Sequence, residues 1–227
     1  MTQRQFSALA PLQSHELGSA FTARGTRGVV DLNPFINIDL FEMTGRTFAV
    51  HPHAGFSVAT YLFDDSTTRF ANRDSLGDRS AIEEGGMRWT VSGSGIVHDE
   101  VVEETGRLGH GAQIFVRTPV DSELVDPIGQ TFSRADLPFV ETGPGGRVRI
   151  AAGSGWGESS PLDEPTHVEL YDLVLAPGAS VEVPFASRHR GFLMTVAGSA
   201  RVSAAGQTGD LGPTSIATFE AGDGDIR

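Results

Sequence analysis

Two short motifs carry the side chains best suited to chemistry, His51-Pro52-His53 and His98-Asp99-Glu100. In a β-strand, residues i and i+2 point to the same face, so each motif presents two potential metal ligands side by side. Two such strands next to each other would bring three imidazoles and one carboxylate together inside a barrel. This set of donors suits Fe(II), Mn, Ni, Cu(II) or Zn. In an octahedral site, two positions would remain for water or substrate.

The spacing alone is not specific, because His-x-His also occurs in strands that bind no metal. Two features favour a site here. Three of the seven histidines fall within the two motifs, and glycines adjoin both of them: Gly55 follows the first, and Gly93-Ser94-Gly95 precedes the second. Asp99 lies between two ligands, so we expect it to point away from the metal, in a solvated or supporting role. We expect the remaining histidines to be structural or exposed: His15, His110, His167 and His189.

The composition excludes several other functions. The chain has no cysteine, which removes disulfides, thiol catalysis and thiolate metal sites. Its formal net charge is −12, and its 17 basic residues form no basic tract. An acidic chain repels phosphate groups, so direct binding to nucleic acid or to an anionic membrane surface is disfavoured. No segment approaches the roughly 20 apolar residues of a membrane span, and the first ten residues lack the apolar run of a signal peptide. We therefore expect a cytoplasmic protein.

The elements that must position these motifs are short β-strands. Segments rich in β-forming residues recur along the chain between glycine- and proline-containing turns, without long helical periods. The strands expected from this pattern cover residues 47–50, 57–63, 88–91, 113–118, 148–152, 168–175 and 192–196. Residues 121–138 are more polar and predict a linker with a short helix. A weak echo of His53-Ala54-Gly55-Phe56 in His189-Arg190-Gly191-Phe192 favours two related domains.

The two metal-ligand motifs belong to a longer pattern of five segments with a defined order and spacing. In chain order these are 33–41 (NPFINIDLF), 51–56 (HPHAGF), 72–79 (NRDSLGDR), 93–100 (GSGIVHDE) and 113–116 (QIFV). Together they resemble the N-terminal domain of the pirin family, over roughly residues 30 to 120. The C-terminal half resembles that family only in pattern.

The resemblance implies an all-β bicupin fold, with two antiparallel β-barrels (jelly rolls) face to face. It implies an N-terminal metal-binding cupin domain over residues 1–120, a linker over 121–140, and a C-terminal cupin-like domain without metal ligands over 141–227. It also implies one divalent metal ion, most often iron, held by His51, His53, His98 and Glu100. Two positions depart from the family pattern: Ala54 replaces the usual arginine, and Ser57 replaces a frequent glutamate.

Pirin-like proteins are associated with quercetin 2,3-dioxygenase activity and, in animals, with transcriptional co-regulation. The first hypothesis is therefore a dioxygenase that acts on a flavonol-like compound and dioxygen, with Glu100 as both ligand and general base. The second is a regulatory protein whose metal, by its redox state, changes a surface that binds a protein partner. The third is a cupin scaffold in which the metal is structural.

Overall fold

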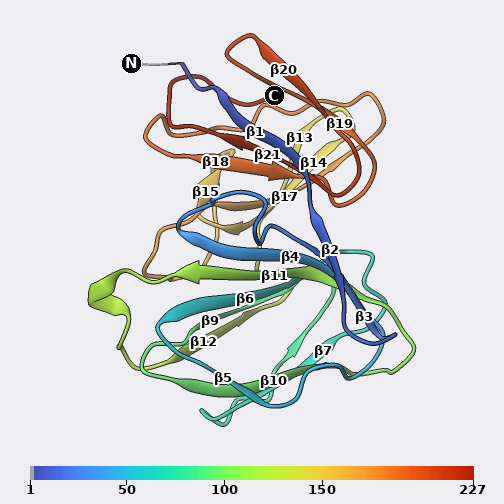
Figure 1. Ribbon diagram of the computed structural model, residues 1–227, viewed down its shortest axis with the longest axis vertical. Coiled ribbons are helices and arrows are strands. Elements are labelled where there is room, and N and C mark those ends of the chain that lie inside the picture. The colour runs from blue at the N-terminus through green and yellow to red at the C-terminus, as the bar shows by residue number, and fades with distance from the viewer. Residues whose placement is uncertain (1–2) are drawn as a thin grey trace.

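Short strands joined by turns make up the structure, a computed structural model that describes residues 3–227 (Figure 1). Within those residues the one helical element is a 3-10 turn, η1 (Val120–Ser122), and no helix is long and apolar enough to cross a membrane. The all-β class expected from the turn-rich sequence is confirmed. Figure 1 shows two bodies of strands, one built mainly from the N-terminal half and one from the C-terminal half.

The N-terminal half contains two sheets that together enclose a barrel. The larger has seven strands, in the spatial order β12 (Ile128–Phe132), β9 (Met87–Val91), β6 (Phe56–Leu62), β11 (Gly109–Arg117), β4 (Phe35–Met43), β3 (Phe21–Gly25) and β2 (Gln13–Glu16). The smaller has four, in the order β5 (His51–His53), β10 (Ile96–Val102), β7 (Phe70–Asp74) and β8 (Ala81–Ile82). All pairings in both sheets are antiparallel.

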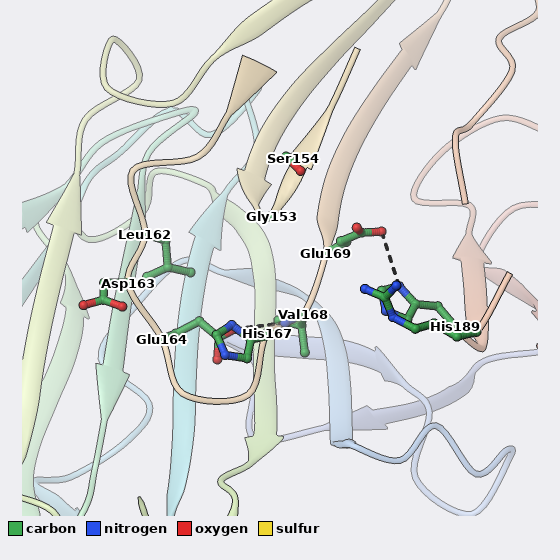
Figure 2. Close-up of a pocket in the computed structure, with 10 residues that line it drawn as sticks. Gly153, Ser154, Leu162, Asp163, Glu164, His167, Val168, Glu169 and His189 are labelled. Atoms are coloured by element: carbon green, nitrogen blue, oxygen red, sulfur yellow. Dashed lines mark hydrogen bonds and ion pairs between the residues drawn. The ribbon is translucent and has the colours of Figure 1, made fainter. Parts of the chain in front are cut away.

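The C-terminal half is made of smaller antiparallel sheets. They comprise β1 (Phe6–Pro11) with β21 (Ser215–Phe219) and β18 (Gly191–Met194); β13 (Phe139–Gly143) with β14 (Gly146–Ala152) and β17 (Leu170–Leu175); β15 (Ser154–Gly155) with β16 (Glu158–Ser159); and β19 (Ala200–Ala204) with β20 (Gln207–Leu211). Loop 160–169, between β16 and β17, lines a cavity in this half (Figure 2).

The division into residues 1–120, 121–140 and 141–227 stays a prediction, but strand pairing departs from it at two places. β1, near the N-terminus, pairs with β21 of the C-terminal half. β12, inside the expected linker, pairs with β9 of the N-terminal sheet. The expected linker therefore contains the short helix η1 and also a strand. The strand expected over residues 47–50 is absent, and that segment is a loop leading into β5.

One apolar core joins the two halves. It takes the outward-facing side chains of β6, β9 and β11, among them Tyr61 and Trp89, and packs them against Ala151, Val168 and Ile216 from the C-terminal half. Trp89 is fully buried, and burying a large aromatic side chain contributes roughly 1.5–3 kcal/mol. β6 is buried on both faces, because its other face lines the barrel interior. That interior face carries the residues that surround the site.

Candidate metal centre

The strands that carry the two histidine motifs are neighbours. β10 pairs with β5 in the register His98 opposite His51 and Ile96 opposite His53. The three imidazoles have ring centroids 4.8–4.9 Å apart, and each offers a ring nitrogen within 4.8 Å of the others. The sequence-based prediction that these three residues converge is therefore confirmed. Within residues 3–227 they are the one group of three or more histidine and carboxylate donors close enough to share an ion.

Glycine turns bring the two strands into this register. The backbone N–H of Gly55, just after β5, donates to the carbonyl of Gly93, just before β10, over 2.9 Å. Gly93 has a φ of +50°, and a Cβ there would lie 2.0 Å from the carbonyl oxygen of Val125. A side chain at this position would therefore be excluded by both backbone conformation and space. The turn needs glycine in order to set the start of the strand that carries His98.

The imidazoles are prepared to bind a cation. Nδ1 of His51 lies 2.8 Å from the carbonyl oxygen of Ala49, which can only accept, so this nitrogen carries the proton and Nε2 keeps its lone pair. Burial, and then the neighbouring His51, lowers the pKa of His53 to about 4. Burial, and then the neighbouring His53, lowers the pKa of His98 to about 4. Both rings are thus neutral near pH 7, as metal ligands must be.

Glu100 follows His98 on the same face of β10 and lies beside a hydroxyl group. The Oγ1 hydroxyl of Thr60 donates to Oε2 of Glu100 over 2.5 Å. The same Oγ1 lies 3.2 Å from Oε1 of Gln113, whose amide nitrogen donates to the carbonyl of Ala59. Burial raises the pKa of Glu100, and the Thr60 hydrogen bond opposes that rise. Its role as the fourth ligand stays a prediction.

Asp99 points to the opposite face of β10, as the alternation predicts, but it is not solvated. It is buried, and it accepts hydrogen bonds from Arg46 over 2.5 Å and from Arg73 over 2.5 and 3.0 Å. The hydrogen bond from Arg73 is the main reason that the pKa of Asp99 is lowered. Two cations on one carboxylate tie β10 to the neighbouring β7 and to the loop before β5. Asp99 therefore holds the ligand strand in place from outside the barrel.

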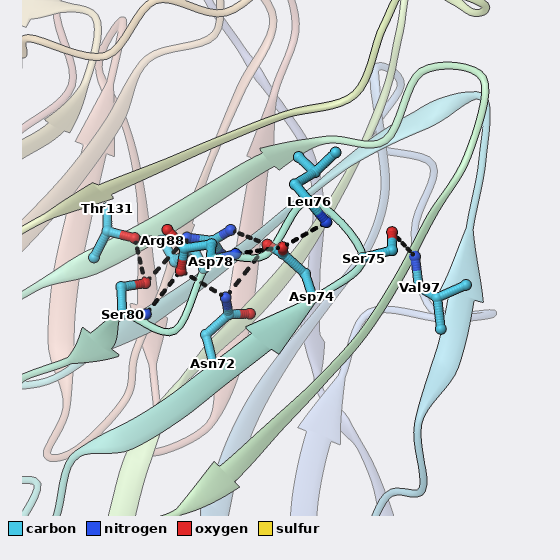
Figure 3. Close-up of polar contacts among 9 residues, drawn as sticks. All are labelled: Asn72, Asp74, Ser75, Leu76, Asp78, Ser80, Arg88, Val97 and Thr131. Carbon is cyan, nitrogen blue, oxygen red and sulfur yellow. Dashed lines mark hydrogen bonds and ion pairs between the residues drawn. The ribbon is translucent and has the colours of Figure 1, made fainter.

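A buried ion-pair network lies one strand away from the ligands (Figure 3). Nη2 of Arg88, on β9, lies 2.6 Å from Oδ2 of Asp74, and both side chains are almost completely buried. Arg88 also lies 3.3 Å from Asp78 and donates to the hydroxyls of Ser80 and Thr131. Asp74 is the direct cross-strand partner of His98. The network thus fixes β7 behind the site.

This network was missing from the sequence-based expectations. Arg73 binds Asp99, and Asp74 is buried against Arg88. One signal in the sequence pointed to it, namely an arginine between Met87 and Trp89 in a strand of otherwise apolar and β-forming residues. A charge in such a strand needs a buried partner.

The four histidines expected to be structural or exposed lie outside the three-histidine group. His15 is half-exposed, 3.9 Å from Asp39, and His110 lies 2.7 Å from Asp65. His167 and His189 line the cavity in the C-terminal half. At the centre itself, two aromatic side chains adjoin His53: the ring centroids of Phe56 and Phe115 lie 5.4 and 6.2 Å from it. They provide an apolar wall beside the imidazoles.

Two neighbouring strands, one with His-x-His and the other with His-x-Glu, lie in one of two antiparallel β-barrels. This arrangement is that of a cupin protein with a candidate metal site. The family model described as Pirin matches residues 16–116, which include all of the candidate ligands. Over residues 16–116 the chain is therefore a pirin-type domain of the cupin fold.

Relatives and solved structures agree with this assignment. "Pirin-like protein 2" of Arabidopsis thaliana is 31% identical over 151 residues, which is 66% of this chain and 45% of that protein. A Pseudomonas aeruginosa protein described as "Putative quercetin 2,3-dioxygenase" is 29% identical over 180 residues, 75% of this chain and 62% of that protein. The chain thus spans about half to three fifths of the length of these two relatives.

The solved structures extend the similarity to nearly the whole chain. A protein from Geobacillus kaustophilus has a TM-score of 0.84 at 22% identity, covering 99% of this chain and 90% of that one. A quercetin 2,3-dioxygenase from Acinetobacter baumannii has a TM-score of 0.77 at 18% identity, covering 99% and 82%. A bacterial pirin from Escherichia coli in complex with nickel(II) has a TM-score of 0.57 at 15% identity, covering 96% of both chains. At these identities the structures support the fold.

Proposed function

We propose that this protein is a metal-dependent dioxygenase of the pirin type that acts on quercetin or a related flavonol-like compound. The observation that carries the proposal is the convergence of three imidazoles, two with a strongly lowered pKa, from strands that also carry the half-buried Glu100. The relative from P. aeruginosa and the neighbour from A. baumannii, both named for quercetin 2,3-dioxygenase, support the choice of substrate.

The donor set fits a divalent metal ion. His51, His53 and His98 would hold it, with Glu100 as the fourth ligand, and three nitrogens plus one oxygen suit Fe(II) as well as the nickel present in the E. coli neighbour. We propose Fe(II) as the native ion. When bound, a divalent ion lowers the pKa of a coordinated hydroxyl and supplies the redox chemistry that dioxygen requires.

The protein's own residues orient the substrate and move its proton. Phe56 and Phe115, next to His53, form the apolar wall against which a flat aromatic ring packs, and they keep bulk water from the imidazoles. Glu100 accepts the proton of the ring hydroxyl at its carboxylate, because burial has raised its basicity. Thr60 holds that carboxylate in position through Oε2.

Oxygen uptake by the Fe(II)-loaded protein with quercetin tests the proposal. We expect uptake that is abolished in His98→Ala and retained in His15→Ala, because His15 is a half-exposed histidine outside the site. Metal content is measured on the same samples. A protein with about one iron per chain and no uptake with quercetin or related flavonols would contradict the proposal.

A second candidate is a regulatory protein whose metal affects binding to a protein partner. The region around β10 favours it, because Val97 on that strand is 43% exposed, and Val50 and Leu76, in the loops that adjoin β5 and β7, are 61% and 50% exposed. Exposed apolar side chains occur at contact surfaces. The acidic charge of the chain favours a protein over nucleic acid as the partner. Partner capture that changes between Fe(II) and Fe(III) protein, and is lost in Val97→Glu, would distinguish it from the enzyme.

A further inference from the structure

We infer that the C-terminal half holds a second ligand site, for a small organic carboxylate that also carries a hydroxyl or ammonium donor. A cavity of about 370 Å³ opens where loop 160–169 faces the loop before β18. Figure 2 shows His167 and His189 extending from these two loops toward a common space. A volume of this size is in the range of sites for small organic ligands. The cavity lies away from the three-histidine group, so it is separate from the metal centre.

The first wall of the cavity is held rigidly. Both carboxylate oxygens of Glu164 accept backbone N–H groups of its own loop, from Thr166 over 2.6 Å and from Val168 over 2.8 Å. The amide of Gln130, on β12, exchanges two hydrogen bonds with the backbone of Asp163. The loop is thus tied both to itself and to the N-terminal sheet. Pre-organised walls of this kind reduce the entropy lost when a ligand binds.

The second wall is fixed by a buried arginine from the other end of the chain. Arg4 is fully buried, and its guanidinium donates to the carbonyls of Ala186 and His189 over 2.9 and 2.8 Å. It also donates to three carbonyls near the C-terminus. The loop that carries Arg188 and His189 therefore has its backbone anchored on both sides of the cavity-lining side chains.

His167 adopts a strained backbone conformation at the cavity wall. Its φ is +56°, in the left-handed region that non-glycine residues seldom occupy. Strain of this kind costs of order 1–3 kcal/mol and gathers at sites where a side chain must be held in one place. Here the conformation places the imidazole of an otherwise exposed loop residue at the cavity (Figure 2).

The cavity is lined by His189, which lies in the segment whose sequence echoes the one around His53. His53 precedes β6, and β6 pairs with β11. His189 precedes β18 in the same way, and β18 pairs with β21, the last strand of the chain. Ser187 stands where the first barrel has His51, and none of residues 3–227 adds a second group of converging metal ligands. The site therefore suits an organic ligand in place of an ion.

The side chains around the cavity define the chemistry of that ligand. The side chain of Arg188 forms no hydrogen bond or ion pair with any residue of 3–227, so its guanidinium is available for bidentate binding of a carboxylate. The imidazole of His167 adds a further donor. Across the cavity, Glu169 lies 3.9 Å from Nδ1 of His189 and offers carboxylate oxygens to a hydroxyl or ammonium group. Leu162 and Val168 supply the apolar part of the lining.

Binding to the full-length, metal-loaded chain tests this site. L-Tryptophan carries a carboxylate and an ammonium group, and 4-hydroxybenzoate carries a carboxylate and a hydroxyl group. We expect at least one of them to bind at one per chain in isothermal titration calorimetry, whereas tryptamine, which lacks the carboxylate, does not bind. Binding of one probe and not the other identifies the donor. Arg188→Gln should weaken binding by about tenfold or more, the effect of losing a hydrogen bond to a charged group.

Two further variants separate the site from general effects on the fold. His167→Gly removes the imidazole and relieves the left-handed strain, so the protein should fold at least as well and still bind the probe about tenfold more weakly. Arg190→Gln changes a neighbouring arginine that pairs with Glu220 over 3.2 Å, and it should bind as the unchanged protein does. The inference is overturned if neither probe binds, or if Arg188→Gln and His167→Gly both bind as tightly as the unchanged protein. It is equally overturned if binding is lost only in His98→Ala, since the probes would then occupy the metal centre.

Discussion

The hydroxyl of Thr60 controls the basicity of Glu100, and removing it should have a measurable consequence. Thr60→Val preserves the shape of the side chain and deletes the donor that lies 2.5 Å from Oε2 of Glu100. Burial raises the pKa of this carboxyl, and the Thr60 hydrogen bond lowers it, so the substitution leaves the upward effect unopposed. A hydrogen bond to a charged group is worth about 1.5–3 kcal/mol. The loss should therefore favour the protonated form of Glu100 by about ten- to a hundredfold and raise the pKa of this group.

The pH dependence of turnover is the first assay. Glu100 must be ionised to accept the substrate's proton, so kcat/KM falls on the acid side as this group becomes protonated. In Thr60→Val the acid limb of the profile should therefore move to higher pH. Thr60→Ser keeps a hydroxyl at the same position, so its pH profile of kcat/KM should resemble that of the unsubstituted protein.

Metal binding provides a second measurement that does not depend on turnover. If Glu100 is a ligand, it must lose its proton to bind the metal, and the pH at which half of the protein takes up metal should also rise in Thr60→Val. The matched Thr60→Ser variant again serves as the control. Superimposable curves for Thr60→Val and the unchanged protein, in both assays, would refute the argument that this hydrogen bond sets the protonation of Glu100.

Two predictions concern stability. Arg88→Met leaves the buried carboxylate of Asp74 without its cation, so it should lower the free energy of unfolding, measured in urea, by about 3–5 kcal/mol. Arg201→Met is the control: it breaks an ion pair in which both side chains are 73% exposed, and it should change the free energy of unfolding by less than about 1 kcal/mol. Equal effects of the two substitutions would contradict the role given to the buried pair. In the metal-free protein, the pKa of His53 and of His98 is about 4 against an ordinary 6.5, so between these pH values the unfolded chain binds protons that the folded chain does not. The free energy of unfolding should therefore fall as pH drops from 6.5 to 4, by up to about 3 kcal/mol per histidine. Urea titrations that show no such fall would contradict the lowered pKa values of the two histidines, and so would a fall that persists in full in His98→Gln.

The core of the metal centre could be predicted because it depends on local geometry. Alternation along a strand places His51 and His53 on one face, and His98 and Glu100 on another, wherever the strands lie. The order of the motifs then identified the family, and the family implied that the two strands are neighbours. The side to which Asp99 points was predictable for the same reason.

The partners of these residues were not predictable, because they come from distant parts of the chain. Thr60 meets Glu100 across 40 residues, and Arg46 meets Asp99 across 53. Neither pairing follows from local spacing or turn chemistry. The pairing of β1 with β21 in the C-terminal sheet is likewise long-range, with Phe6 opposite Phe219. Residues 6–11 were not among the expected strands, and periodicity does not indicate which sheet edge a strand joins.

Burial is the largest cause of the two opposite shifts at the centre. Apolar side chains of the N-terminal half, among them Phe41, Phe70 and Ile82, pack together in a buried cluster. A buried environment disfavours any charge, so it lowers the pKa of the imidazoles and raises that of Glu100. The same barrel thus keeps the nitrogen ligands neutral and the carboxylate basic. The hydrogen bond from Thr60 is then the adjustment that returns Glu100 toward the ionised form, which both metal binding and proton transfer require.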